Sequence, residues 1–154
     1  MTHLNEGDKA PDFKGTDENG NEISLDSIKG QKTILYFYPK DNTLGCTAQS
    51  CNLRDHQSEL QSKGYQIIGV SEDSAKKHQK CIAKYESPFP IIADTEKEVI
   101  NAFGVWGPKK FMGREYEGIH RTTFVIDEKG VITDIFKKVK TKTHAEQILE
   151  KIEQ

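Results

Sequence analysis

The sequence predicts an α/β fold in which helices flank a mixed central sheet, and three observations lead to that prediction. Short β-branched and aromatic runs at residues 33–38 and 65–70 are typical of strands buried on both faces. A helix-like segment follows each run, which implies parallel strands joined by crossovers. Later, strand-like segments at 122–126 and 131–136 flank a turn at 127–130, and such a hairpin adds antiparallel strands.

Turn and helix signals divide the first half of the chain into elements. An Asn-Gly pair within residues 17–21 predicts a tight turn between two short N-terminal strands. A helix is expected over residues 43–62, because Leu53 and Leu60 lie seven positions apart and Gly64 follows as a stop signal.

The second half continues the alternation of strands and helices. A helix is expected over residues 74–85 and a short strand at 91–93. Capping-box patterns at 95–98 and 143–146 predict the starts of two further helices. The glycine-containing residues 104–118 are expected to form a connection. This order is thioredoxin-like, with an N-terminal β-hairpin extension, and we expect a single domain over residues 1–154.

Composition excludes several classes of function. The 154 residues are 34% apolar and 30% charged, with a net charge of -2, so we expect neither a nucleic-acid nor a membrane partner. No stretch reaches the roughly 20 apolar residues of a membrane span, and the N-terminus lacks the features of a secretory signal. We therefore expect a cytoplasmic protein. Three cysteines are too few for a disulfide scaffold, so each is either buried and inert or reactive.

Two of the three cysteines, Cys46 and Cys51, lie in the stretch "YPKDNTLGCTAQSCNLRD". Cys46 follows the expected strand 33–38 and lies at the start of the expected helix. The carboxyl end of a strand is where α/β proteins bind ligands, and a helix N-terminus stabilises a thiolate. Position and polar neighbours such as Thr43 therefore favour a reactive Cys46 over a buried structural one.

The same stretch closely resembles the active-site loop of the peroxiredoxins, specifically the bacterioferritin comigratory protein or PrxQ branch. Pro39, Thr43 and Cys46 match the pattern Pro-x-x-x-Thr-x-x-Cys of that family, and Cys51 matches a second cysteine five residues later. Five further segments resemble the family in the family's order, so the resemblance covers nearly the whole chain: "GDKAPDF", "GVSEDS", "PFPIIAD", "FGVWG" and "RTTFVID".

The resemblance implies a thiol peroxidase that acts on hydrogen peroxide and organic hydroperoxides. Cys46 would attack the peroxide and become a sulfenic acid, which Cys51 would convert to a disulfide for reduction by thioredoxin or a related dithiol. Arg121 would stabilise the thiolate and the peroxide oxygens, Thr43 would offer its hydroxyl, and Pro39 would shield the site. The resemblance implies no metal or organic cofactor, and the branch is often monomeric.

The chain departs from the branch pattern at two positions next to Cys46. Leu44 stands where the branch usually has proline, and Gln49 stands where it usually has glutamate. The second change removes a negative charge from the neighbourhood of the thiolate and of Arg121. We expect both changes to affect rate and substrate preference rather than the existence of the activity.

Two other functions remain as alternatives. A thioredoxin-type thiol–disulfide oxidoreductase shares the fold but requires a Cys-x-x-Cys pair, which the spacing of Cys46 and Cys51 does not give. A metal-binding module could use these two cysteines and His56, but a tetrahedral site needs four converging ligands. We expect His56, ten residues beyond Cys46, to be solvated.

The spacing of Cys46 and Cys51 predicts a conformational change. On one regular helix their Cα atoms would lie roughly 8.6 Å apart and face nearly opposite sides, whereas a disulfide requires about 7 Å or less. The helix must therefore unwind before the bond closes. The third cysteine, Cys81, lies beside Ile82 in the expected helix 74–85, and we expect it to be buried and structural.

Overall fold

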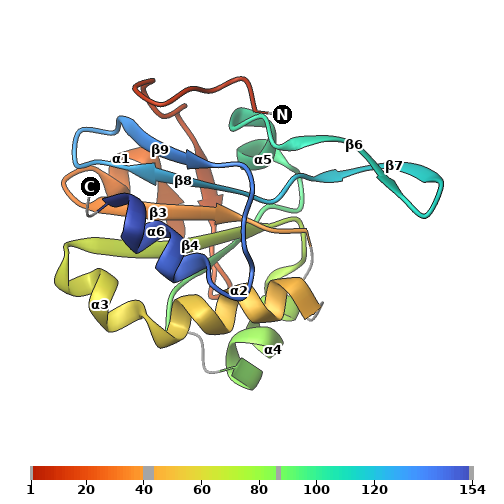
Figure 1. The fold of residues 1–154 in the computed structure, drawn as a ribbon, viewed down its shortest axis with the longest axis horizontal. Helices are drawn as coiled ribbons and strands as arrows, with labels where there is room; N and C mark the ends of the chain where they lie inside the picture. The colour runs from red at the N-terminus through yellow and green to blue at the C-terminus, as the bar shows by residue number, and fades with distance from the viewer. Residues whose placement is uncertain (1, 40–43, 86–87, 153–154) are drawn as a thin grey trace.

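The computed structural model describes residues 2–39, 44–85 and 88–152, and a five-stranded sheet lies at its centre (Figure 1). The strand order is β5-β4-β3-β8-β9. β3, β4 and β5 run parallel, whereas β8 is antiparallel to both β3 and β9, which confirms the predicted mixed sheet. These strands are β3 Lys32–Phe37, β4 Tyr65–Ser71, β5 Ile91–Ala93, β8 Thr122–Ile126 and β9 Ile132–Phe136.

Two hairpins lie outside the central sheet. β1 (Lys14–Thr16) and β2 (Glu22–Ser24) form the predicted N-terminal pair. β6 (Trp106–Phe111) and β7 (Arg114–Ile119) form a second hairpin that projects from the body (Figure 1), so the expected connection over 104–118 was wrong. The sequence obscured this hairpin because a proline lies inside β6, which weakens a strand pattern. Its turn also uses Met112 and Gly113 at positive φ, 51° and 80°, rather than an Asn-Gly pair.

Six helices pack on the two faces of the sheet within the described residues. The helix expected over 43–62 is divided into two, because the chain leaves helical geometry at His56, whose φ and ψ are -107° and 7°. The helices are α1 Leu25–Ile28, α2 Leu44–Asp55, α3 Gln57–Ser62, α4 Ala75–Tyr85, α5 Glu98–Ala102 and α6 His144–Ile152. None of the described helices is both long and apolar enough to cross a membrane.

The central strand β3 separates two hydrophobic clusters. Successive side chains of a strand point to opposite faces, so Ile34 and Tyr36 lie in one cluster, and Leu35 and Phe37 lie in the other. Helices α2, α3 and α6 contribute to the first cluster, whereas α1, α5 and the N-terminal segment contribute to the second. This double coverage explains why β3 reads as a continuous apolar run.

The start of α5 differs from the predicted capping box at residues 95–98. Lys97 occupies the N-cap in a left-handed conformation and makes no capping side-chain hydrogen bond. The buried carboxylate of Asp94 instead accepts a hydrogen bond of 2.7 Å from the backbone N–H of Ile100. Burial raises the pKa of Asp94, and the backbone donors of α5 oppose this shift.

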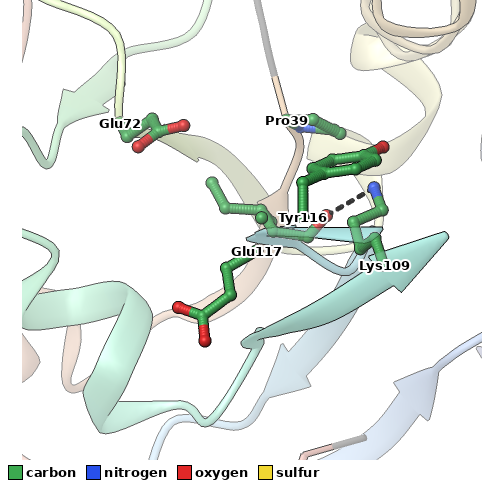
Figure 2. Close-up of a pocket in the computed structure, with 7 residues that line it drawn as sticks. Pro39, Glu72, Lys109, Tyr116 and Glu117 are labelled. Carbon is green, nitrogen blue, oxygen red and sulfur yellow. Dashed lines mark hydrogen bonds between the residues drawn. The ribbon is translucent and has the colours of Figure 1, made fainter. Parts of the chain in front are cut away.

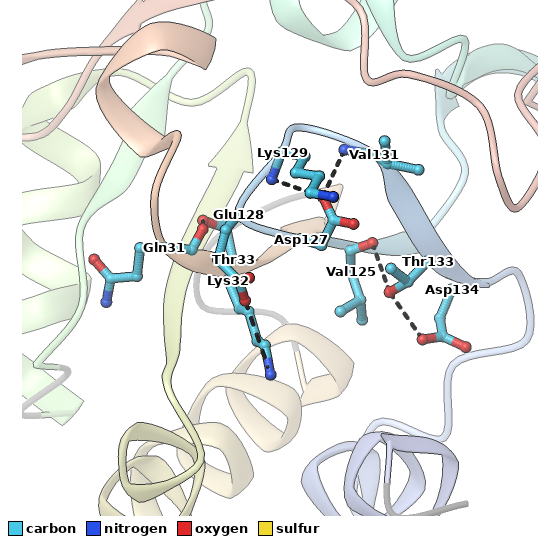
Figure 3. Close-up of polar contacts among 10 residues, drawn as sticks. All are labelled: Gln31, Lys32, Thr33, Val125, Asp127, Glu128, Lys129, Val131, Thr133 and Asp134. Carbon is cyan, nitrogen blue, oxygen red and sulfur yellow. Dashed lines mark hydrogen bonds and ion pairs between the residues drawn. The ribbon is translucent and has the colours of Figure 1, made fainter.

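The turn between β8 and β9 is held by short-range polar contacts (Figure 3). Asp127 Oδ1 accepts hydrogen bonds from the backbone N–H groups of Lys129 and Val131, each 2.9 Å long. Lys32 Nζ lies 3.9 Å from Glu128 Oε1, which links the turn to the start of β3. The side-chain hydrogen bonds of Asp127 are therefore local, whereas the Lys32 contact and backbone hydrogen bonds from residues 10 and 30 join the turn to distant segments.

Candidate active site at the carboxyl end of β3

Strand pairing brings two predicted site residues to the same edge of the sheet. Phe37, the last residue of β3, lies opposite Thr122, the first residue of antiparallel β8. The residues after β3 therefore lie beside those before β8. Pro39 follows Phe37 by two positions, and Arg121 immediately precedes Thr122. This is also the edge from which the chain leads into α2.

One face of α2 is buried against the sheet. Gln49, Ser50 and Leu53 have exposed fractions of 0%, 4% and 0%, and Ser50 Oγ lies 3.4 Å from the hydroxyl of Tyr36 in β3. Residues spaced three, four and seven apart share one face of a helix. Position 46 precedes these three residues by those intervals, so it lies on the same inward-facing side of α2, although the structure does not describe its side chain.

Arg121 is attached to this face of α2. Its Nη1 donates a hydrogen bond of 2.5 Å to Gln49 Oε1, across 72 positions of sequence. Gln49 lies one helical turn beyond position 46, so the bond holds the guanidinium on the helix face that carries Cys46. Gln49 was expected in the neighbourhood of this arginine, and the structure confirms that proximity.

His144 at the start of α6 is a neutral neighbour of this site. Its pKa is lowered to about 4 by burial, and the charge of Arg121 adds to the lowering, while a hydrogen bond to Gln147 opposes it. Gln147 Nε2 donates to the carbonyl oxygen of Lys138, so its Oε1 accepts from His144 Nδ1 at 2.9 Å. His144 Nε2 therefore accepts from the hydroxyl of Thr123 at 2.8 Å.

The end of α2 beyond Cys51 is tied to α6. Asn52 Oδ1 accepts a hydrogen bond of 2.6 Å from the backbone N–H of Ala145, and Asn52 Nδ2 donates to Glu146 at 2.9 Å. His56 Nε2 lies 2.9 Å from the same carboxylate, and its Nδ1 lies 2.9 Å from the carbonyl oxygen of Asn52. His56 is therefore partly solvated, with 32% of its side chain exposed, and it is anchored to α6. Both ring nitrogens have protein partners, which argues against His56 as a metal ligand.

A cavity of about 430 Å³ adjoins Pro39 at the base of the β6–β7 hairpin (Figure 2). The rings of Pro39 and Tyr116 lie on one side of it, and the carboxylates of Glu72 and Glu117 lie on the other. Lys109 Nζ donates to the carbonyl oxygen of Ile119 at 2.9 Å in its wall. Pro39 was a predicted site residue, whereas Lys109, Tyr116 and Glu117 were missed because residues 104–118 were expected to form a connection without side-chain alternation.

The structure describes some of the predicted site residues fully and others only in part or not at all. Pro39, Cys51 and Arg121 are described, and Cys51 is a half-buried free thiol within α2. The backbone of Cys46 lies in α2, two residues after its start at Leu44. Thr43 lies outside the described residues. Both cysteines belong to one helix, which is the arrangement that the spacing argument assumed.

Comparison with known proteins identifies the family. The model of the AhpC/TSA family matches residues 6–135. A putative peroxiredoxin Bcp of Haemophilus influenzae is 44% identical over 150 residues, which cover 97% of each chain. Peroxiredoxin Bcp of Escherichia coli is 41% identical over 149 residues, covering 97% of this chain and 96% of the relative.

Solved structures agree in fold. A cysteine-to-serine variant of Xylella fastidiosa PrxQ has a TM-score of 0.92 at 29% identity, covering 99% of this chain and 98% of its own. The bacterioferritin comigratory protein of Xanthomonas campestris, studied for alkyl peroxide reduction, has a TM-score of 0.89 at 30% identity, with the same coverage. The chain therefore belongs to the AhpC/TSA family and, within it, to the Bcp/PrxQ peroxiredoxins, which are thiol peroxidases.

Proposed function

We propose that Cys46 is the peroxidatic nucleophile of this thiol peroxidase and that it reduces hydrogen peroxide and organic hydroperoxides. The thiolate attacks one peroxide oxygen, an S–O bond forms as the O–O bond breaks, and the electron pair leaves on the departing oxygen. That oxygen takes up a proton to give water or an alcohol. Sulfur is oxidised by two electrons to the sulfenic acid, and the peroxide is reduced by two.

Cys51 resolves the sulfenic acid in this proposal. Its thiol sulfur attacks Cys46, water leaves, and a Cys46–Cys51 disulfide forms. A thioredoxin-type dithiol then reduces the disulfide by thiol–disulfide exchange and returns both thiols. The chain needs no metal or organic cofactor for this cycle, because sulfur carries the change in oxidation state. Thr43 and Pro39 retain the roles expected from the resemblance.

The hydrogen bond between Arg121 and Gln49 is the observation that carries this proposal. It places a guanidinium on the α2 face of position 46, where a cation stabilises both a thiolate and the negative charge that develops on the departing oxygen. The cavity beside Pro39 offers room for the organic part of a hydroperoxide, with Tyr116 and Ile119 as apolar lining.

We further infer a single-domain, monomeric, cytoplasmic enzyme without nucleic-acid or membrane partners. The net charge of -2 supports the absence of a nucleic-acid partner, and dependence on a dithiol reductant suits a reducing compartment. Size-exclusion chromatography with light scattering on the reduced protein tests the monomer, and a dimer mass contradicts it.

A thioredoxin-coupled peroxidase assay with hydrogen peroxide and cumene hydroperoxide tests the proposed chemistry. We expect turnover in the parent protein and none above background in Cys46→Ser. Cys51→Ser should consume one equivalent of peroxide and then stop with thioredoxin as reductant. Turnover by Cys46→Ser would contradict the assignment of the nucleophile. Disulfide reduction without peroxide consumption would support the thioredoxin-type alternative.

Amide hydrogen exchange tests the conformational step that the disulfide requires. Both cysteines lie in α2 with nearly opposite directions around the helix axis, so bond formation must unwind this helix. We expect oxidation to increase exchange over residues 44–53 and to break the contacts of Asn52 with α6, while β3 and β8 stay protected. Identical exchange of the oxidised and reduced forms over this segment would contradict the step.

A further inference from the structure

Gln49 is a polar side chain with no exposed surface, located one turn beyond position 46. Burying an amide is unfavourable unless both its ends make hydrogen bonds. Its oxygen has a partner, since Oε1 accepts from Arg121 Nη1 at 2.5 Å. A guanidinium can only donate, so the oxygen end of the amide must face Arg121 and the NH₂ end must not. The chemistry of the pair fixes the orientation of the amide.

The NH₂ end of Gln49 is an unused donor. Nε2 is buried and has no hydrogen-bond partner among the residues that the structure describes. It is bonded to the same carbon as the oxygen that accepts from Arg121, so it lies close to the guanidinium. Two kinds of N–H donor therefore adjoin the buried face of α2 that carries position 46. Both favour a negative charge in the space beside them.

A glutamate at position 49 would have a different effect. A carboxylate could accept the same hydrogen bond from Arg121, but it would add a negative charge and, when ionised, could not donate. The amide therefore anchors the guanidinium without opposing its field. Among the described residues, titratable groups near this corner of the sheet include the Tyr36 hydroxyl beside Ser50, His144, which is neutral, and Glu72, Lys109 and Glu117 around the cavity next to Pro39.

We propose that Gln49 is a positioning residue of the peroxidase site: it fixes Arg121 with a neutral acceptor and adds a second donor beside it, so that an anion is stabilised at position 46. This inference rests on the proposed role of Cys46 as nucleophile. Gln49 acts through Arg121 and through the local field, and it takes no part in bond making. An amide rather than a carboxylate at position 49 thus tunes the thiolate of this chain.

Two substitutions separate the charge of residue 49 from its anchoring role. Gln49→Glu keeps an acceptor for Arg121 and adds a negative charge, whereas Gln49→Met keeps the length of the side chain and removes acceptor and donor. Gln61→Glu, on the exposed surface of α3, is the matched control for the same chemical change away from the site. All three are made in a background in which Cys51 and Cys81 are serine, so that only the Cys46 thiol titrates.

The thiol pKa and the peroxide rate constant are then measured over pH. We expect Gln49→Glu to raise the Cys46 thiol pKa by about one unit, because a like charge lies one helical turn away. Its rate should return to the parent value at pH above that pKa, since Arg121 is still held. Gln49→Met should have a rate constant about tenfold lower than the parent, and this loss should persist on the high-pH plateau, because the guanidinium loses its acceptor. Gln61→Glu should match the parent in both quantities.

Two results would overturn the inference. One is a Gln49→Glu thiol pKa within about 0.3 units of the parent value, and the other is a Gln49→Met plateau rate equal to that of the parent. A loss of folding in Gln49→Met is detected by its thermal transition, and the Gln49→Glu measurement then decides alone. The proposed function fails separately, through activity of Cys46→Ser, so the two failures are distinguishable.

Discussion

The two ends of the central sheet are both polar, but they are built differently. At the β8–β9 turn, Asp127 binds backbone N–H groups only two and four residues away. At the opposite end, Arg121 reaches Gln49 across 72 positions, and Asn52 reaches Ala145 across 93. The side-chain hydrogen bonds at the turn are thus short-range, whereas the second end retains an unpartnered donor on Gln49 among the described residues and a cavity beside Pro39.

This difference distinguishes polar contacts that stabilise a turn from polar contacts that position groups at the active site. The side-chain bonds of Asp127 form within the turn itself, although backbone N–H groups of Ala10 and Gly30 also donate to carbonyl oxygens of the turn. A long-range contact forms only when the whole sheet and its helices are in place, so it positions groups that the chain could not place locally. A buried donor without a protein partner costs folding free energy, so it calls for an explanation, and the proposed role of Gln49 beside Arg121 supplies one.

The largest effect should follow from removing the long-range cation. Arg121→Met eliminates the guanidinium that faces α2, and loss of one such charge-stabilising donor lowers enzymatic rates by about 100-fold or more. We expect the second-order rate constant of peroxide reduction to fall by that factor, measured by stopped-flow under single-turnover conditions. Arg121→Lys retains the charge without the planar donor geometry, so its rate should lie between those of the parent and Arg121→Met. A rate for Arg121→Met within threefold of the parent would contradict the role of this end of the sheet.

The next effect concerns the dependence of stability on pH at the same end. The pKa of His144 is about 4 in the folded protein and about 6.5 when the chain unfolds, so the unfolded state binds more protons between these values. Stability is therefore fully present above pH 6.5 and is lost as the pH falls towards 4, by at most about 3 kcal/mol. Urea unfolding of the parent and His144→Gln from pH 7 to pH 4 measures this term.

His144→Gln also loses the bonds to Thr123 and Gln147, so its stability is lower at every pH. The informative quantity is the slope of the unfolding free energy against pH. The carboxylates contribute equally to this slope in both proteins, so a difference in slope reports His144. The parent should have the steeper slope between pH 4 and 6.5. Equal slopes would show that His144 titrates alike in the folded and unfolded states.

The parts of the fold that the sequence predicted are those with local causes. The runs at β3 and β4, the turn around Gly20 and the β8–β9 hairpin each carry their signal within a few residues. The β6–β7 hairpin was missed because Met112 is an unusual turn residue, and the capping box at 95–98 failed because the carboxylate of Asp94 caps α5 from outside the motif. A local sequence pattern does not show which of several nearby polar side chains will cap a helix in the folded protein, because tertiary packing decides that.

The site divides in the same way. Cys46 and Cys51 were identified from one contiguous stretch, and Arg121 required the family resemblance, because nothing in the residues around it distinguishes it from a surface arginine. The contacts of Asn52 and His56 with α6 had no sequence signal at all, since they depend on how two helices pack. Pairings between distant segments are where structure adds most to the sequence.

A smaller effect is expected at the short-range end. Asp127→Ala removes the acceptor for two backbone N–H groups, which can then bind water because the turn is at the surface. We expect a loss of about 1 to 2 kcal/mol in unfolding free energy and an unchanged peroxide rate constant at pH 7. Asp127→Asn keeps an oxygen acceptor and should recover most of the stability. If Asp127→Ala changed the peroxide rate constant and left the unfolding free energy unchanged, the proposed distinction between a stabilising end and a catalytic end of the sheet would be wrong.

The smallest effect should come from Cys81, which tests whether a thiol outside both ends is inert. Cys81 lies in α4 with an exposed fraction of 4%, so its predicted burial is confirmed, and a structural role remains the prediction. Its thiol would have to leave its packed position to reach another cysteine, whereas Cys51 requires only the unwinding of α2. Cys81→Ala should therefore lose about 1 kcal/mol of stability and keep full turnover with thioredoxin.

In the native parent, a thiol reagent should modify Cys81 far more slowly than after unfolding. Peptide mapping of the oxidised parent should find Cys46 bonded to Cys51, and a Cys46–Cys81 bond, or loss of recycling in Cys81→Ala, would show that this buried thiol takes part in the cycle.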